Sequence, residues 1–261
     1  MVRPAAMQGT LHGKQIGPAM PRQTRRAIIS GLSALLLPAS QPAQLTIRLA
    51  RLGEFPDQIV GGEILSVVYR RLGIAVEFVD VPAKRALTLS SSGELDGEVQ
   101  RIAGIQRDYP TLLQISPPIN YIEPAAFTTG LRFEVRGWQS IRNYRIGIVR
   151  GVGSSEDGTR GMQSVVAANN LDSLVRMLDA GRFDVLVTDL FSGSIAVKKL
   201  NLASRIRPLT PPLQQISIYH YLNERHRDLA EKVAAVLRDM EASGELAQLR
   251  TMFRRQLLET S

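Results

Sequence analysis

Strand and helix patterns alternate along most of this chain, and that alternation restricts the fold more than any other feature of the sequence. The first series reads as strand, helix, strand and helix over residues 45–50, 62–73, 74–80 and 82–93. The second reads as strand, the start of a helix, helix and strand over residues 144–151, 154–166, 171–181 and 182–189. Residues 226–258 read as two helices hinged near Gly244. This order predicts an α/β fold whose sheets are largely parallel and carry helices on both faces.

Two segments, one in each series, repeat the same arrangement. In "LSSSGELDGEVQR" (89–101) and "MLDAGRFDVLVTD" (177–189), a glycine ends a helix and an Asp follows three residues later. Five residues beyond that Asp lies Arg101 in the first segment and Asp189 in the second. Because strand side chains alternate with period two, the equal offset places both residues on matching faces. Both positions fall towards the carboxyl end of a strand, where open parallel sheets bind ligands.

This pairing of a cation with an anion would suit a zwitterionic ligand if the two halves face each other. Two structural alternatives stay open for the same residues. Arg101 can form an ion pair with Glu98 or Glu94, which lie close by in the sequence. Asp189 can cap the helix that begins directly after it.

The composition excludes several functional classes. Of the 32 Lys and Arg residues, five lie within residues 1–43, which contain no acid, so residues 44–261 hold 27 basic against 24 acidic residues. The net charge of +8 is therefore concentrated at the N-terminus, and no basic stripe for nucleic acid is expected. The chain has no Cys and three His without ligand spacing, so we expect no disulfide, no metal centre and no cofactor.

Residues 1–43 have the three parts of an export signal. Arg22, Arg25 and Arg26 form a basic head, residues 27–37 form an apolar stretch, and small residues follow. Eleven residues at ~1.5 Å rise cover about 16 Å, well short of the ~30 Å core of a bilayer. The stretch "TRRAII" is similar to the twin-arginine motif, and Sec export is the other route. We therefore predict a cleaved signal and a periplasmic protein.

The chain from about residue 44 to 253 resembles the periplasmic solute-binding proteins of family 3, the amino-acid-type binding components of ABC importers. The matching segments are "EILSVVYRRLGIAVEFVDVP", "YRIGIVRGVGSSED", "MLDAGRFDVLVTDLFSG" and "NERHRDLAEKVAAVLRDMEASGELAQL". The resemblance implies a two-lobed fold of type II whose lobes close on a ligand, with crossings near 124–130 and 206–212. The lobes would comprise residues 44–127 with 211–261, and residues 128–210. It also implies a monomer, with an ABC permease as the partner that receives the ligand.

The resemblance also implies roles for individual residues. In that family an Asp at the position of Asp189 holds the ligand's ammonium group. The usual pair of Thr before a carboxylate-binding Arg is missing from "EVQRIAGIQRDYP", so Arg101 is the first choice for that role and Arg107 the second. An Arg suits it because the guanidinium can donate two parallel hydrogen bonds to a carboxylate. The remaining candidate ligand contacts are Glu98, Arg85 and Ser154.

Two other functions compete with solute capture for import. One is a periplasmic dehydratase of the cyclohexadienyl type on the same fold, in which Glu98 would be the acid. The other is a sensory module that reports a ligand to a membrane-bound kinase or receptor. We favour binding without catalysis.

Overall fold

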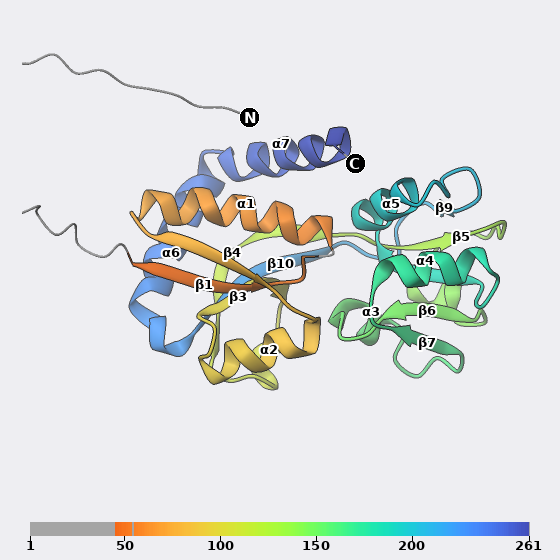
Figure 1. Cartoon of the computed structure of the whole chain (residues 1–261), viewed down its shortest axis with the longest axis horizontal. Coiled ribbons are helices and arrows are strands. Elements are labelled where there is room, and N and C mark those ends of the chain that lie inside the picture. Colours follow the sequence, from red (N-terminus) through yellow and green to blue (C-terminus); the bar gives the residue numbers. More distant parts are fainter. Residues whose placement is uncertain (1–44, 54, 261) are drawn as a thin grey trace, which may run out of the picture. The chain divides into compact units, whose positions relative to one another are not determined.

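The computed structural model describes residues 45–53 and 55–260 and contains two five-stranded sheets with helices packed around them (Figure 1). The predicted export signal lies outside the described residues. The first sheet has the order β2-β1-β3-β10-β4, and its strands are β1 (Thr46–Arg51), β2 (Ala75–Asp80), β3 (Gly97–Ile102), β4 (Leu112–Ile122) and β10 (Ile216–Asn223). The second has the order β7-β6-β8-β5-β9, and its strands are β5 (Pro124–Thr128), β6 (Ile146–Val149), β7 (Val165–Ala168), β8 (Val185–Asp189) and β9 (Arg207–Pro208).

Strand directions follow the same plan in both sheets. In the first, β1 is parallel to β2 and β3, whereas β10 is antiparallel to both β3 and β4. In the second, β6 is parallel to β7 and β8, whereas β5 is antiparallel to β8 and β9. The predicted α/β fold with two lobes of mostly parallel strands is therefore confirmed. We call the units around the two sheets the first lobe and the second lobe.

The helices that flank the sheets lie close to the predicted ranges, with two exceptions. They are α1 (Pro56–Arg71), α2 (Ala83–Ser92), α3 (Gly153–Gly158), α4 (Leu171–Asp179), α5 (Leu190–Lys199), α6 (Arg227–Ala242) and α7 (Glu245–Thr260). The prediction for α1 began six residues late. Pro56 in fact occupies the first turn, where its missing N–H costs nothing. The helix predicted to start within 154–166 stops at Gly158, and Val165 and Val166 pair with β6 instead.

The first crossing between the sheets lies at Glu123, immediately before the predicted segment 124–130. Residues 124–128 form β5, which pairs antiparallel with β8 in the second sheet. The second crossing runs from the end of β9 to the start of β10. The chain therefore returns to the first lobe to form β10, α6 and α7.

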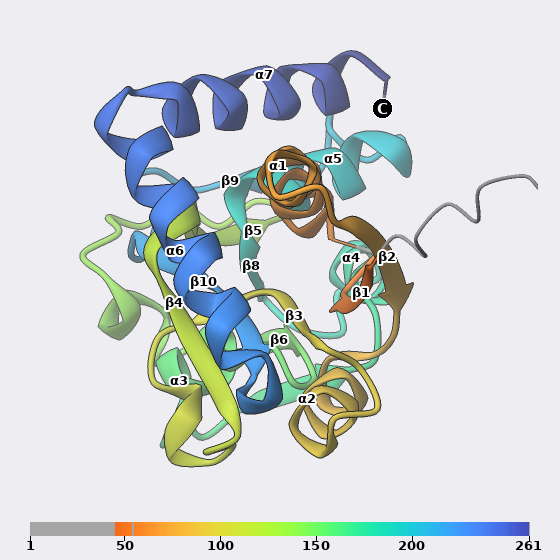
Figure 2. The same cartoon turned by 90° about the vertical axis from the view of Figure 1, so that its left-hand side faces the viewer.

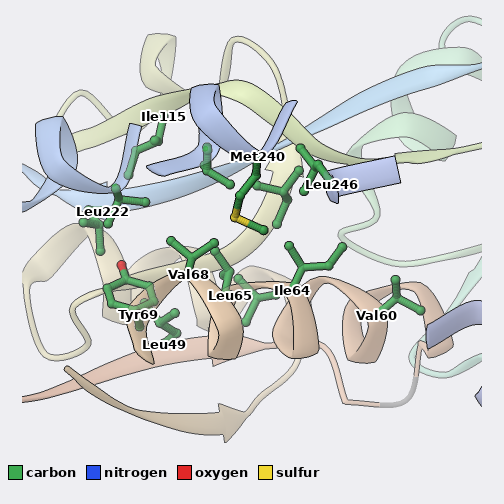
Figure 3. Packing of buried hydrophobic residues seen from close by; sticks show 14 of the residues in the cluster. Leu49, Val60, Ile64, Leu65, Val68, Tyr69, Ile115, Leu222, Met240 and Leu246 are labelled. Carbon is green, nitrogen blue, oxygen red and sulfur yellow. The ribbon is translucent and has the colours of Figure 1, made fainter. Parts of the chain in front are cut away.

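One face of α1 supplies much of the core of the first lobe. Ile64, Leu65 and Val68 are fully buried and point towards Met240 and Leu246 of the C-terminal helices (Figure 3). Burying each such side chain stabilises the fold by about 1.5–3 kcal/mol. Figure 2 shows α6 lying along β4 and α7 continuing above α1. This packing fixes the start of α1, which forms part of the cleft described below.

The repeated sequence segments form the same structure twice. In the first lobe the Asp96 carboxylate accepts a hydrogen bond from the Arg48 backbone N–H (2.7 Å), and the Asp96 N–H donates to the Arg48 carbonyl (2.8 Å). In the second lobe Asp184 and Arg145 make the same reciprocal pair, at 2.9 and 2.8 Å. Each Asp thus fixes the start of one strand against its parallel neighbour. Positions counted from the two Asp residues are therefore structurally equivalent.

Candidate ligand-binding cleft

A cleft of about 380 Å³ is lined by side chains and backbone from both lobes. Its walls include the start of α1, the end of β3 and the 3₁₀ turn after it, the N-terminal end of α3, and the end of β8. Arg101 and Asp189, the two residues placed at equivalent positions by the repeat, both line it. The structure therefore brings together the pair that the sequence singled out.

Arg101 is already engaged inside the protein. Its guanidinium donates to Glu98 Oε2 at 2.8 Å and to the Ala83 carbonyl oxygen at 3.1 Å. Glu98 is fully buried and is not among the residues that line the cleft. Burial raises the pKa of the Glu98 carboxyl, and the Arg101 charge acts in the opposite direction. The ion pair with Glu98, which the sequence left open, is thus present, and Arg101 faces the cleft as one half of it.

A fully buried histidine of β10, His220, contacts the backbone of β3 next to this ion pair. His220 Nδ1 lies 2.7 Å from the Glu98 carbonyl oxygen, and its Nε2 lies 2.8 Å from the Tyr69 hydroxyl. Burial lowers the pKa of His220 to about 4, so the ring is neutral near pH 7. A neutral ring can donate from Nδ1 to the carbonyl and accept from the tyrosine, which fixes its tautomer.

Asp57 and Asp189 form the floor of the cleft, and both contact the fully buried Ser192. The Ser192 hydroxyl donates to Asp57 Oδ1 (2.8 Å), and its backbone N–H donates to Asp189 Oδ2 (2.9 Å). Asp189 caps α5 through this second bond, as the structural alternative for it predicted, and its Oδ1 accepts from the Glu123 N–H (2.8 Å). Both carboxylates also line the cleft and are more than nine-tenths buried. Capping and facing the cleft are therefore compatible roles for Asp189.

The carboxyl group of Asp57 has an unusual proton affinity. Burial, followed by the nearby negative charge of Asp189, raises its pKa from 3.8 to about 7. Hydrogen bonds from Ser192 and Gln100 and the charge of Arg254 only partly oppose this rise. Ionising Asp57 near neutral pH is therefore costly until a positive charge approaches it.

Polar side chains from two elements surround Asp57. Gln100 Nε2 donates to Asp57 Oδ2 (2.8 Å), and Gln58 Nε2 donates to the Gln100 carbonyl oxygen (3.3 Å). Gly61 allows this approach, because a Cβ atom there would lie 2.3 Å from Gln100 Oε1. Gln58 lines the cleft and is 8% exposed, and its Oε1 atom accepts no hydrogen bond from the described residues.

The sequence did not identify Asp57, Gln58 or Gln100 as site residues. Asp57 follows a proline at a helix start, where an acidic residue ordinarily indicates interaction with the helix dipole. Its burial depends on Ser192, which lies 135 positions further along the chain. A local pattern carries no signal for such a contact.

The remaining predicted site residues occupy different environments. Ser154 lines the cleft and is buried in the first turn of α3. Arg107 also lines it, but 81% of its side chain is exposed, and its Nε lies 3.9 Å from Asp108. Arg85 is exposed on α2 and is not among the lining residues, whereas the adjacent Lys84 is. Successive helix residues differ by about 100° in direction, which explains why only one of the two neighbours faces the cleft.

Neither a metal centre nor a membrane helix is found in the described part of the chain. No group of three or more His, Cys, Asp or Glu residues between 45 and 260 could hold a metal ion. None of the helices in this range has the length and apolar character needed to cross a bilayer.

Two five-stranded sheets joined by crossing segments, with a cleft lined from both, define the two-lobed fold of periplasmic binding proteins. Solved structures share it. A histidine kinase sensor domain with similarity to periplasmic binding proteins matches 81% of this chain and 96% of its own, with a TM-score of 0.67 and 16% identity. The amino acid ABC transporter substrate-binding protein AbpA from Streptococcus pneumoniae, bound to L-arginine, matches 82% of this chain and 95% of its own, with a TM-score of 0.66 and 15% identity.

Sequence comparison adds one relative. An uncharacterized protein of Shewanella oneidensis is 27% identical over 180 residues, which are 67% of this chain and 68% of that protein. No family model matches the chain. The structural matches, at this level of identity, establish the fold.

Proposed function

We propose that this protein binds a small polar solute in the cleft between its lobes. The observation that carries the proposal is that Arg101 of β3 and Asp189 of β8, which come from different sheets, line one cleft of about 380 Å³. Clefts of roughly this size hold small molecules, and a few precisely placed polar groups give them specificity. A ligand that touches both lobes favours the closed arrangement through its higher affinity for that state.

We further propose that the bound solute is passed to an ABC permease after export of the chain to the periplasm. The likeness to AbpA supports import, and the likeness to a histidine kinase sensor domain supports sensing as the second candidate. Both functions begin with the same capture step. A permease gene next to the gene of this protein would favour import, and a membrane-bound kinase gene there would favour sensing.

The dehydratase alternative receives less support from the cleft. Glu98, the acid it requires, is fully buried behind Arg101 and is not a lining residue. A general acid must lie within hydrogen-bond reach of its substrate. We expect no aromatic product when the protein is incubated with prephenate or arogenate and followed by absorbance. Turnover that disappears in Glu98→Gln would restore the enzyme hypothesis.

The proposed binding function is tested by a thermal-shift screen against amino acids, polyamines and organic acids. A ligand specific for the folded state at 100 times its Kd adds about 2.7 kcal/mol, so the melting temperature should rise by several degrees. Asp189→Asn should weaken this rise, because asparagine can still cap α5 but carries no charge. Arg85→Gln, outside the cleft, is the matched control and should respond like the wild type. No shift with any compound in the panel would contradict the proposal.

A further inference from the structure

The charges of the cleft do not form a balanced pair. Arg101 is compensated by Glu98 at 2.8 Å within the protein. Asp57 and Asp189, in contrast, take part in none of the ion pairs among the described residues. Arg254 lies near Asp57 but is not a lining residue, and its guanidinium stacks on the rings of Tyr121 and Phe191 at 4.8 Å. The floor of the cleft therefore carries negative charge without a paired cation.

The hydrogen-bonding capacity of the floor points in the same direction. Each carboxylate oxygen of Asp57 and Asp189 accepts one bond within the protein and has a further lone pair. Gln58 Oε1 is a buried acceptor that lacks any donor among the described residues. Its amide nitrogen donates to the Gln100 carbonyl, which fixes the orientation of the group and leaves the oxygen as the unpaired atom. A buried acceptor without a donor is costly, and a ligand N–H would remove that cost.

We infer that the cleft selects a small organic cation, with an ammonium or guanidinium group held by Asp57, Asp189 and Gln58, and that a carboxylate on the ligand is not required. This inference rests on the proposed binding function and specifies its ligand class. A carboxylate at Arg101 would meet a guanidinium that Glu98 already neutralises, and the other cations that line the cleft, Lys84, Arg107 and Arg160, are exposed. The inference therefore names a mono- or dication in place of the zwitterionic ligand expected from the sequence.

Matched pairs of compounds test this directly. Agmatine and cadaverine are arginine and lysine without the carboxylate, so calorimetry on each pair isolates the contribution of that group. We expect the amines to bind at least tenfold more tightly than the corresponding amino acids. Asp57→Asn should reduce the affinity for agmatine at least tenfold, while Asp172→Asn on α4, outside the cleft, should leave it nearly unchanged.

A second readout separates charge recognition from a purely structural role of Asp57. The groups that face it are Asp189 and Ser192 from the second lobe, Gln100 from β3, and the more distant charge of Arg254. A bound cation favours the ionised carboxyl, so binding should release a proton at pH 6–7, and the heat of agmatine binding should depend on the buffer. Asp57→Asn should lose this dependence.

The outcomes distinguish the inference from the function on which it rests. Arginine or lysine binding as tightly as its decarboxylated partner would overturn the cation inference and leave solute binding intact. Absence of binding by every amino acid, amine and organic acid would overturn both.

Discussion

Replacing Asp57 by asparagine should make the stability of the unliganded protein less sensitive to pH. Burial beside Asp189 raises the pKa of Asp57 to about 7, whereas the unfolded chain has the ordinary value of 3.8. Between these values the folded state holds a proton that the unfolded state has lost, so the free energy of unfolding falls as the pH rises. At up to ~1.4 kcal/mol for each pH unit, the wild type loses about 3 kcal/mol relative to Asp57→Asn between pH 4.5 and pH 7.

The difference between the two proteins is the quantity to measure. His220 has its pKa lowered from 6.5 to about 4, so its contribution to stability is present above pH 6.5 and is lost as the pH falls towards 4. This change opposes that of Asp57 and flattens the profile of the wild type. Subtracting the variant removes the contribution of His220, which both proteins share.

Urea unfolding at pH 4.5, 6, 7 and 8 gives this difference. Urea is preferred because guanidinium belongs to the class of cation proposed as ligand. Asparagine gives up one of the hydrogen bonds from Ser192 and Gln100, which lowers stability by ~1 kcal/mol at every pH. Asp108→Asn, at a side chain that is 68% exposed, should give a flat difference. A flat difference for Asp57→Asn as well would refute the reasoning.

Two further predictions concern the fold around β3. Arg101→Met should lower the free energy of unfolding by about 3–5 kcal/mol, because Glu98 is left buried without its cation, and Glu98→Leu in the same chain should recover most of the loss. Additive losses measured by urea unfolding would contradict this coupling. Gly97→Ala should lower it by roughly 3 kcal/mol, because the new Cβ would lie 2.1 Å from a carbonyl oxygen of β10. Gly130→Ala, with no atom within 4 Å of the new Cβ, should change the melting temperature little, and an equal effect at both glycines would contradict the prediction.

The sequence predicted those parts of the fold that depend on local periodicity. Strands β1, β2, β6 and β8 and most helices were found because apolar residues alternate or recur every three to four positions, whereas β4, β7 and β10 were not predicted. The prediction failed at the start of α1, because the predicted helix began at Gly62 and left out the first turns, which contain Pro56 and Gly61. Gly61 and Gly62 allow α1 to pack closely against Gln100 and Phe78. Helix propensities do not include such long-range packing.

The candidate site was predictable only to the extent that it follows the repeat. Arg101 and Asp189 were found because equal offsets on equivalent strands lead to one cleft. The ion pair of Arg101 could be stated as an alternative because Glu98 is three residues away. The association of Asp57 with Asp189 could not, because it requires α5 of the second lobe to reach α1 of the first through Ser192.

The reciprocal hydrogen bonds of Asp96 and Asp184 have a consequence for engineering this protein. They hold the strands in position through backbone groups, far from the strand ends where Arg101 and Asp189 lie. The anchoring of the scaffold and the charge presented to a solute are therefore encoded by separate residues. Changing the charges of Arg101 and Asp189, with Glu98 altered to match, is a route to binding proteins of different specificity that keep the same framework.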